Sequence, residues 1–390
     1  MQIIPSIKLM NSLDELTAEV NLSERYISPI ANHVTQGPTL TPYFIETARD
    51  IMAKNKKLSR FGLPGSLVAA YVLEVLDQYQ IHFNTDDEKD LILNAFARNA
   101  KCFSSKEYSN NPYLKAVKLP EITKSDSQLE FSNANFMPYE LFIYNTPIQT
   151  QSVGKYGIVN IPPIGYFDET YSYVCLLEND VPWMSITPNE VSTMEKPIKM
   201  ARGKVLTLGL GLGYFAYMAA IKPNVESVTV IEKNENIIKL FSEHILPQFG
   251  TAKDKIQIIN MDAIEYINTL EDGNFDFCFA DLWDSASLSE MGIYMKCREA
   301  LRRFKKTNTA FWISDTFLSL FQATAFVKIS NEAAKTIGAR QLPFNTTSSP
   351  IELYIDNLMK NVTIKTENNL KQYLSLNYFD RAIKSTDIIY

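Results

Sequence analysis

The segment Leu208-Gly-Leu-Gly-Leu-Gly213 places three glycines, alternating with leucine, between two apolar runs. Glycines at such a position let the backbone turn tightly and approach a ligand closely. Residues 204–208 have the composition of a strand and residues 214–221 that of a helix, whose first turn offers free N–H groups. Residues 205–221 carry no charge, but the stretch is short for a membrane span, which needs about 20 apolar residues. The segment therefore predicts a strand, a glycine turn and a helix at a ligand site.

Strand-like and helix-like runs alternate through the chain beyond residue 203. We expect strands at 204–208, 227–231, 256–260, 275–280, 310–313 and 351–355, and helices at 214–221, 235–246, 263–270, 290–304 and 317–336. This alternation predicts an α/β fold in which a mostly parallel sheet carries helices on both faces. Ligands of such sheets bind at the carboxyl ends of the strands.

The first half of the chain has two other patterns. Residues 42–54, 68–79 and 86–96 repeat apolar side chains at helical spacing, and Thr85-Asp-Asp-Glu88 is a capping-box pattern. From about residue 130, short runs rich in β-branched and aromatic residues predict β-hairpins at 139–144, 157–161, 171–177 and 183–186. We expect a helical region over 1–129, a small β-domain over 130–200 and the α/β domain over 201–390.

Composition excludes several classes of protein. The net charge of −6, from 38 basic and 44 acidic residues, excludes a polycation built for nucleic acid. The contents of 21% charged and 12% aromatic residues exclude a disordered chain. Four scattered cysteines and three histidines predict neither a disulfide framework nor a metal site, and favour a cytoplasmic protein. No secretory signal is visible at the amino terminus. We expect a small-molecule partner rather than a membrane or nucleic acid, and a homodimer is compatible with the sequence.

Acidic residues follow the expected strands of the α/β domain. Glu232 ends the second strand, Asp262 the third, and Asp281 and Asp284 follow the fourth. The spacing of Gly211, Gly213 and Ala216 also fits a dinucleotide fingerprint, and Glu232 suits either kind of nucleotide because its carboxylate can accept ribose hydroxyls. Several carboxylates in one crevice would, however, repel a pyrophosphate. They suit a ligand with adenosine at one end and cationic groups at the other, such as S-adenosylmethionine. Taken singly, each acid serves equally well as a helix cap.

The motifs from Lys204 to Gly213, then Glu232, Asp262-Ala263 and Asp281, resemble those of class I S-adenosylmethionine-dependent methyltransferases. Within that superfamily, the sequence is most similar to the spermidine synthase branch, which has an Asp-x-x-Asp after strand four and a small β-domain before its Rossmann-like core. The resemblance implies that Glu232 holds the ribose and Asp262 the adenine amine, and that Asp281 lies beside the transferred group.

Departures from that branch affect the end of the site that holds the diamine. The family's Gly-Gly-Gly-Asp-Gly loop has an Asp that helps to hold the donor's amine, and Leu212 stands at that position. The Tyr and the His or Gln of the family's Asp-Glu-x-x-Tyr-His/Gln-Glu segment are replaced by Thr193 and Met194. Many methyltransferases have an acid two residues before the first glycine, where this chain has Thr207.

We therefore expect an S-adenosylmethionine-dependent methyltransferase with an unidentified acceptor. The alternatives are an aminopropyltransferase that resembles spermidine synthase and a sensor that binds the nucleoside without turnover. Asp281 and Asp284 are the expected catalytic residues. The expected cofactor-binding residues are Gly209, Gly211, Gly213, Glu232, Asp262, Ala263 and Asp281. Trp283 and Tyr214 flank the expected donor and are interpreted as packing residues.

Overall fold

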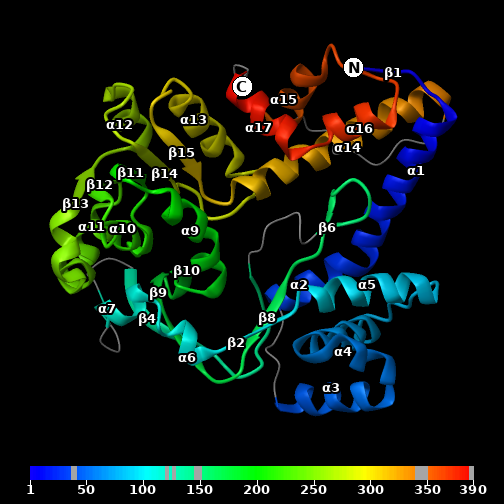
Figure 1. Ribbon diagram of the computed structural model, residues 1–390, viewed down its shortest axis with the longest axis horizontal. Coiled ribbons are helices and arrows are strands. Elements are labelled where there is room, and N and C mark those ends of the chain that lie inside the picture. Colours follow the sequence, from blue (N-terminus) through cyan, green and yellow to red (C-terminus); the bar gives the residue numbers. More distant parts are fainter. Residues whose placement is uncertain (37–41, 119–122, 125–128, 145–151, 339–349, 386–390) are drawn as a thin grey trace.

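A computed structural model describes residues 1–36, 42–118, 123–124, 129–144, 152–338 and 350–385 (Figure 1). Its amino-terminal part is helical, as predicted. The helices are α1 (Ile7–Leu22), α2 (Ser28–Gln36), α3 (Pro42–Lys54), α4 (Gly62–Gln78), α5 (Asp86–Arg98), α6 (Ser105–Tyr108) and α7 (Pro112–Ala116). Thr85 caps α5 by accepting the N–H of Glu88 at 3.1 Å. The Glu88 carboxylate accepts the N–H of Asn84 instead of that of Thr85, so only half of the expected capping box forms.

The β-region contains small antiparallel sheets and one parallel pair. A four-stranded sheet has the order β10-β9-β4-β3, built from β3 (Thr123–Lys124), β4 (Leu129–Phe136), β9 (Tyr171–Glu178) and β10 (Val181–Ser185). A second sheet joins β2 (Lys101–Phe103), β8 (Ile164–Phe167) and β5 (Phe142–Ile143), with β2 parallel to β8, and β6 (Ser152–Val153) pairs with β7 (Val159–Asn160). The hairpin pattern is confirmed, but the strand expected at 139–144 is wrong for all but Phe142 and Ile143. Tyr139 has a φ of 64°, which breaks an extended strand.

Helix α9 (Pro188–Met200) connects the β-region to the main sheet (Figure 1). The sequence placed a polar boundary near residues 196–203, yet the helix continues through Lys196 and Pro197 to Met200. Thr187 caps it by accepting the N–H of Glu190. The first turns of α9 therefore lie directly before the α/β domain and in contact with it.

The main sheet has five parallel strands, in the order β13-β12-β11-β14-β15. These strands are β11 (Gly203–Leu208), β12 (Val225–Glu232), β13 (Ile256–Asn260), β14 (Phe277–Ala280) and β15 (Asn308–Phe311). The flanking helices are α10 (Tyr214–Ala220), α11 (Glu235–Leu240), α12 (Ala263–Thr269), α13 (Met291–Leu301) and α14 (Ser314–Ile337). The predicted α/β class is thus confirmed. The strand order reverses between β11 and β14, where such sheets bind their ligands.

The strand expected at residues 351–355 is wrong, because this segment lies within helix α15 (Pro350–Met359). Ile351, Tyr354, Ile355 and Met359 are buried together, and their spacing is that of one helix face. Two more helices follow, α16 (Glu367–Tyr373) and α17 (Leu376–Ser385). Between α15 and α16, β16 (Thr363–Ile364) pairs in parallel with β1 (Gln2–Ile3), so the start of the chain lies against its carboxyl-terminal region (Figure 1).

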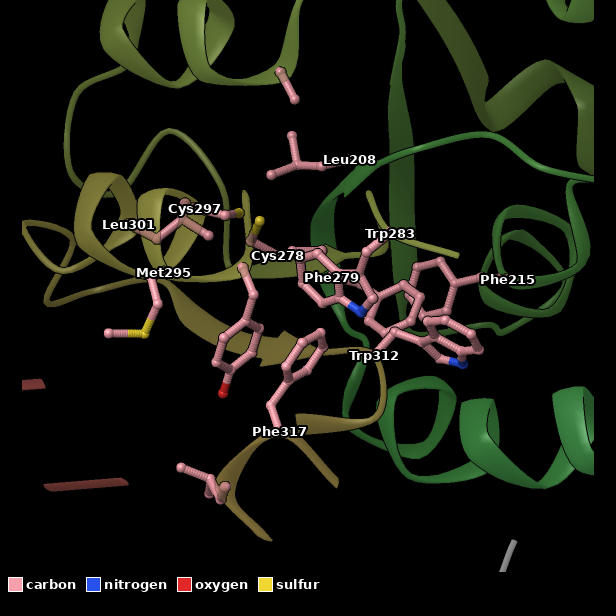
Figure 2. Packing of buried hydrophobic residues seen from close by; sticks show 14 of the residues in the cluster. Leu208, Phe215, Cys278, Phe279, Trp283, Met295, Cys297, Leu301, Trp312 and Phe317 are labelled. Carbon is pink, nitrogen blue, oxygen red and sulfur yellow. The ribbon is translucent and has the colours of Figure 1, made fainter. Parts of the chain in front are cut away.

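The core beneath the sheet's ligand edge is rich in aromatic residues (Figure 2). Phe317 stacks on Tyr294 with ring centroids 4.2 Å apart, and Trp283 meets both rings edge-on. Phe215 packs on Phe279 of β14 at 4.4 Å. These contacts fix the backbone from which the site residues project. Across the part of the chain that the structure describes, every helix is too short or too polar to span a membrane.

Candidate functional site

The glycine segment forms the turn that the sequence predicts. Gly209, Gly211 and Gly213 have φ values of 97°, 54° and 72°, a region in which other residues are strained. A Cβ atom at Gly209 would collide with the backbone carbonyl of Asp281, and one at Gly213 with the ring of Phe241. Gly209 therefore allows the ends of β11 and β14 to approach closely, and Gly213 allows the turn to pack against Phe241.

A pocket of about 270 Å³ lies at this edge of the sheet. Most of the residues expected to form the site line it: Gly209, Gly211, Glu232, Asp262, Ala263, Asp281 and Asp284. Gly213 is not among the lining residues and is instead the N-cap residue that precedes α10. The fold thus brings together residues that are widely separated in the sequence.

Glu232 holds the glycine turn in place. One carboxylate oxygen accepts the N–H of Leu210 at 3.2 Å, and the other accepts the N–H of Asn234 at 2.8 Å. Each carboxylate oxygen has two lone pairs, so both can accept a further hydrogen bond from a ligand in the pocket. Glu232 can therefore position the turn and bind a ribose at the same time.

Asp262 is a helix cap as well as a pocket residue. Its Oδ1 accepts the N–H groups of Ile264 at 2.8 Å and Glu265 at 3.1 Å, at the start of α12. The capping role considered for each acid is thus realised here. Both capping hydrogen bonds go to Oδ1, so Oδ2 takes no part in the cap and can accept a hydrogen bond from an amine.

Asp281 and Glu190 are two half-buried carboxyl groups that line the same pocket. Burial raises the pKa of Glu190 to about 7. Burial also holds the pKa of Asp281 well above its ordinary value, and the negative charges of Glu190 and Asp284 raise it further. A cation in the pocket would favour the charged form of both carboxyl groups. The pair can therefore accept hydrogen bonds from an amine.

Sequence reasoning missed Glu190, although it quoted the segment that contains this residue. Glu190 lies in the first turn of α9, where acids are common because they interact favourably with the helix dipole, so its position alone did not mark it as a site residue. A second signal was its place in the Asn189-Glu190 pair, where the spermidine synthase branch has Asp-Glu.

The chain's three tryptophans, Trp183, Trp283 and Trp312, also line the pocket. Trp183 Nε1 donates to Asp284 Oδ1 at 3.0 Å, and Trp312 Nε1 donates to Thr193 Oγ1 at 2.8 Å. The Trp283 ring is 4% exposed, and its Nε1 is buried without a partner. The interpretation of Trp283 as a packing residue agrees with its contacts to Tyr294 and Phe317 (Figure 2).

The pocket is strongly acidic. Its charged lining residues are Glu190, Glu232, Asp262, Asp281 and Asp284 against Lys233 alone. Within the described ranges, no three His, Cys, Asp or Glu side chains are grouped so that they could hold a metal ion. An acidic pocket of this kind favours a ligand with organic cationic groups.

Residues 191–372 match the family model of the spermine/spermidine synthase domain. The resemblance seen in the sequence is confirmed for this part of the chain. We call residues 191–372 the synthase-like domain. It contains the glycine turn and all the expected site residues, whereas Glu190 directly precedes it.

Solved structures show weaker likenesses to the chain. A spermidine synthase from Thermotoga maritima is 16% identical, with a TM-score of 0.29 over 38% of this chain and 54% of that one. A spermidine synthase bound to the transition-state analogue AdoDATO is 15% identical, with the same TM-score and coverage. A putative O-methyltransferase from Klebsiella pneumoniae is 18% identical, with a TM-score of 0.24 over 31% of this chain and 52% of that one. The chain thus spans about half the length of these structures. A comparison with curated proteins finds no match.

The expected departures from the spermidine synthase and methyltransferase patterns lie in or beside the pocket. Leu212 and Met194 line it, and Thr193 accepts the hydrogen bond from Trp312. Thr207 is buried at the pocket wall. The residues expected to bind the nucleoside therefore follow the family's pattern, while the other end of the pocket has different side chains.

Proposed function

We propose that this protein transfers the aminopropyl group of decarboxylated S-adenosylmethionine to an amine. The observation that carries the proposal is the pair of half-buried carboxyl groups of Glu190 and Asp281, which lies with Asp284 in a pocket with a surplus of acids. Decarboxylated S-adenosylmethionine and an amine acceptor are both purely cationic, so they neutralise these carboxylates. The match to the spermine/spermidine synthase domain supports the same chemistry.

In this proposal, the two ends of the donor contact different strands of the sheet. Glu232 binds the ribose hydroxyls, and Asp262 Oδ2 accepts from the adenine amine. The sulfonium lies over the glycine turn, beside Asp281. The rigid turn then holds the donor for in-line attack, and such positioning supplies a large part of the rate in displacements of this kind.

The carboxyl pair would move the proton that the reaction releases. An ammonium cannot attack, so Asp281 or Glu190 first accepts a proton from the acceptor. The neutral nitrogen forms a C–N bond to the methylene carbon beside sulfur. The C–S bond breaks, and its electron pair stays on sulfur as a neutral thioether. The raised pKa of Glu190, about 7, suits a group that takes a proton near neutral pH.

Methyl transfer from intact S-adenosylmethionine is the second candidate, and Leu212 and Thr207 favour it. Neither side chain offers a charge to a donor ammonium, whereas intact S-adenosylmethionine brings its own carboxylate, which N–H groups of the glycine turn can bind. The sequence alone led to this interpretation. Aminopropyl transfer is favoured over it because Glu190 adds a further acid to the pocket.

Side-by-side assays with the two donors test the proposal. The full chain is incubated with a mixture of mono- and diamines and either donor, and products are identified by mass spectrometry. We expect aminopropylated amine and methylthioadenosine from the decarboxylated donor. Asp281→Asn should lower turnover by about 10²–10⁴-fold while donor binding changes little. Methylated product from the intact donor would establish the second candidate instead. Binding of either donor without any product would support the remaining alternative, a sensor that binds the nucleoside without turnover.

A further inference from the structure

The order of the strands sets the order of groups along the pocket. Asp262 follows β13, Glu232 ends β12, Gly209 follows β11, Asp281 follows β14 and Trp312 follows β15. These strands are neighbours in that same order. A donor that extends from Asp262 to Gly209 therefore presents its reactive carbon near Asp281, and the acceptor occupies the side toward β15 and α9.

The side of the pocket beyond Asp281 and Glu190 is apolar. Met194 lies one helical turn after Glu190 on α9, and Trp312 faces the same pocket from the end of β15. Trp312 Nε1 and Thr193 Oγ1 are already engaged, because the first donates to the second at 2.8 Å. The two surfaces offer a thioether and an indole to whatever lies between them.

Among the described residues that line the pocket, none of the acids follows β15. Glu195, the next acid of α9, is exposed and pairs with Lys199 at 3.4 Å. Asp284 accepts the hydrogen bond from Trp183 and contributes its charge to Asp281, on the near side. A second ammonium would be buried against Met194 and Trp312 without a counter-charge, which is unfavourable.

We propose that the amine acceptor has a single ammonium group and an uncharged apolar body, which lies against Met194 and Trp312 while its nitrogen lies between Glu190 and Asp281. This inference rests on the proposed function and names its substrate class. A linear diamine would satisfy the acidic end of the pocket but not the apolar end.

The test compares two amines of equal length, n-pentylamine and putrescine, which differ by a terminal methyl in place of an ammonium. With the decarboxylated donor, we expect kcat/KM for n-pentylamine to exceed that for putrescine at least tenfold. Equal use of the two amines, or preference for putrescine, would overturn the inference and leave the proposed function intact. Absence of aminopropyl transfer to every amine would instead remove the proposed function, and this inference with it.

Intrinsic fluorescence gives a second measurement that does not depend on turnover. Because the three tryptophans all line this pocket, titration with each amine in the presence of methylthioadenosine should change their emission. We expect tighter binding of n-pentylamine, again by at least tenfold. An equal or lower dissociation constant for putrescine would count against an apolar subsite.

A charge introduced at Met194 should reverse the preference. In Met194→Glu, the putrescine to n-pentylamine ratio of kcat/KM should rise at least tenfold, because the second ammonium gains a partner. The control is Met200→Glu, on the same helix but 40% exposed and outside the pocket, where the ratio should not change. An unchanged ratio in a folded Met194→Glu protein would show that the acceptor's body does not reach this side chain. The comparison of the two amines on the unaltered chain decides the proposal if that variant does not fold.

Discussion

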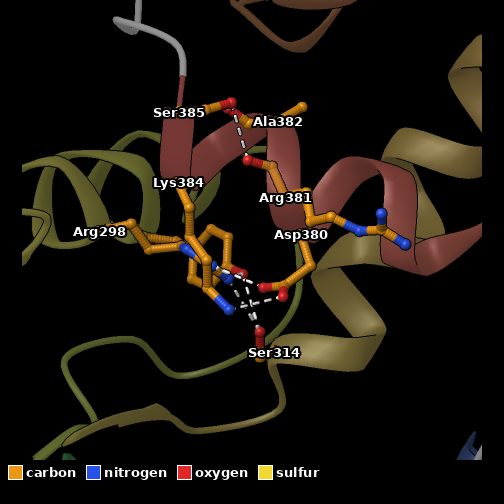
Figure 3. Close-up of polar contacts among 8 residues, drawn as sticks. Arg298, Ser314, Asp380, Arg381, Ala382, Lys384 and Ser385 are labelled. Atoms are coloured by element: carbon orange, nitrogen blue, oxygen red, sulfur yellow. Dashed lines mark hydrogen bonds and ion pairs between the residues drawn. The ribbon is translucent and has the colours of Figure 1, made fainter.

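Arg298 Nη2 donates to Asp380 Oδ1 at 2.8 Å and thereby joins α13, which flanks the main sheet, to α17 near the carboxyl terminus (Figure 3). The other terminal nitrogen of Arg298 donates to Tyr294 Oη at 2.7 Å and to Ser314 Oγ at 3.2 Å. Ser314 begins α14 directly after Trp312 and Ile313. One buried guanidinium thus connects the carboxyl-terminal helix to the turn that carries a pocket tryptophan.

Replacing Arg298 should therefore destabilise the protein more than replacing Lys384, the second basic side chain that pairs with Asp380. The Arg298 side chain is 4% exposed, whereas Lys384, which binds the second Asp380 oxygen at 2.7 Å, is 63% exposed. We expect Arg298→Met to lower the free energy of unfolding by about 3 kcal/mol, since it breaks a buried pair. Lys384→Met should cost less than about 1 kcal/mol. Urea denaturation of both variants provides the comparison, and similar losses would mean that burial of the pair is not what matters.

Alanine should have opposite effects on stability at two glycines, because an added Cβ collides with the backbone at one of them and meets open space at the other. Gly209→Ala should cost more than about 3 kcal/mol, because it adds a collision with the Asp281 carbonyl to a strained positive φ. Gly292, within α13, has no atom near an added Cβ. Gly292→Ala should stabilise the protein by about 0.5–1 kcal/mol, the difference in helix propensity. Thermal and urea unfolding measure both changes. A stable Gly209→Ala protein would contradict the observed path of the turn.

Burial of Glu190 makes stability depend on pH. Its pKa rises from 4.5 to about 7 on folding, so the native state binds the proton more tightly than the unfolded state does. The stabilisation is complete below about pH 4.5 and is lost as the pH rises through about 7. Relative to Glu190→Gln, the unaltered protein should lose about 3 kcal/mol of unfolding free energy between pH 4.5 and pH 8. Denaturant titrations at several pH values give the difference between the two curves. Parallel curves would show that the carboxylate is solvated in the native state.

The sheet was predictable because its strands are short apolar runs with turn residues on both sides. Residues 256–260 form a strand with the predicted bounds, and the acids after the strands meet at one edge because parallel strands end there. The strand prediction for residues 351–355 was wrong because a five-residue apolar run does not distinguish a strand from one face of a helix.

Other features depend on contacts between distant segments, which single-sequence patterns do not encode. The pairing of β1 with β16 involves two residues on each side, more than 350 positions apart in the chain. In the sequence, Glu190 has only the pattern of an acid in the first turn of a helix. Its place in the pocket depends on how α9 packs against the sheet. Its effect on the pKa of Asp281 follows from that packing and not from its neighbours in sequence.

Glu232 provides the last prediction, which separates ligand binding from support of the glycine turn. We expect Glu232→Ala to weaken donor binding by about 1.5–3 kcal/mol, the range for hydrogen bonds to charged groups. Part of this loss would come from the freed N–H groups of Leu210 and Asn234, which Glu232 now binds at 3.2 and 2.8 Å. Glu232→Gln keeps one acceptor oxygen and should recover part of the affinity, because a neutral amide oxygen still accepts from a ribose hydroxyl or from one N–H. Glu235→Ala, three residues later on the exposed side of α11, is the control and should leave the affinity unchanged. Isothermal titration calorimetry with the decarboxylated donor measures all three. If the folded Glu232→Ala protein binds the donor as tightly as the unaltered chain, the carboxylate supports the turn only and the ribose lies elsewhere.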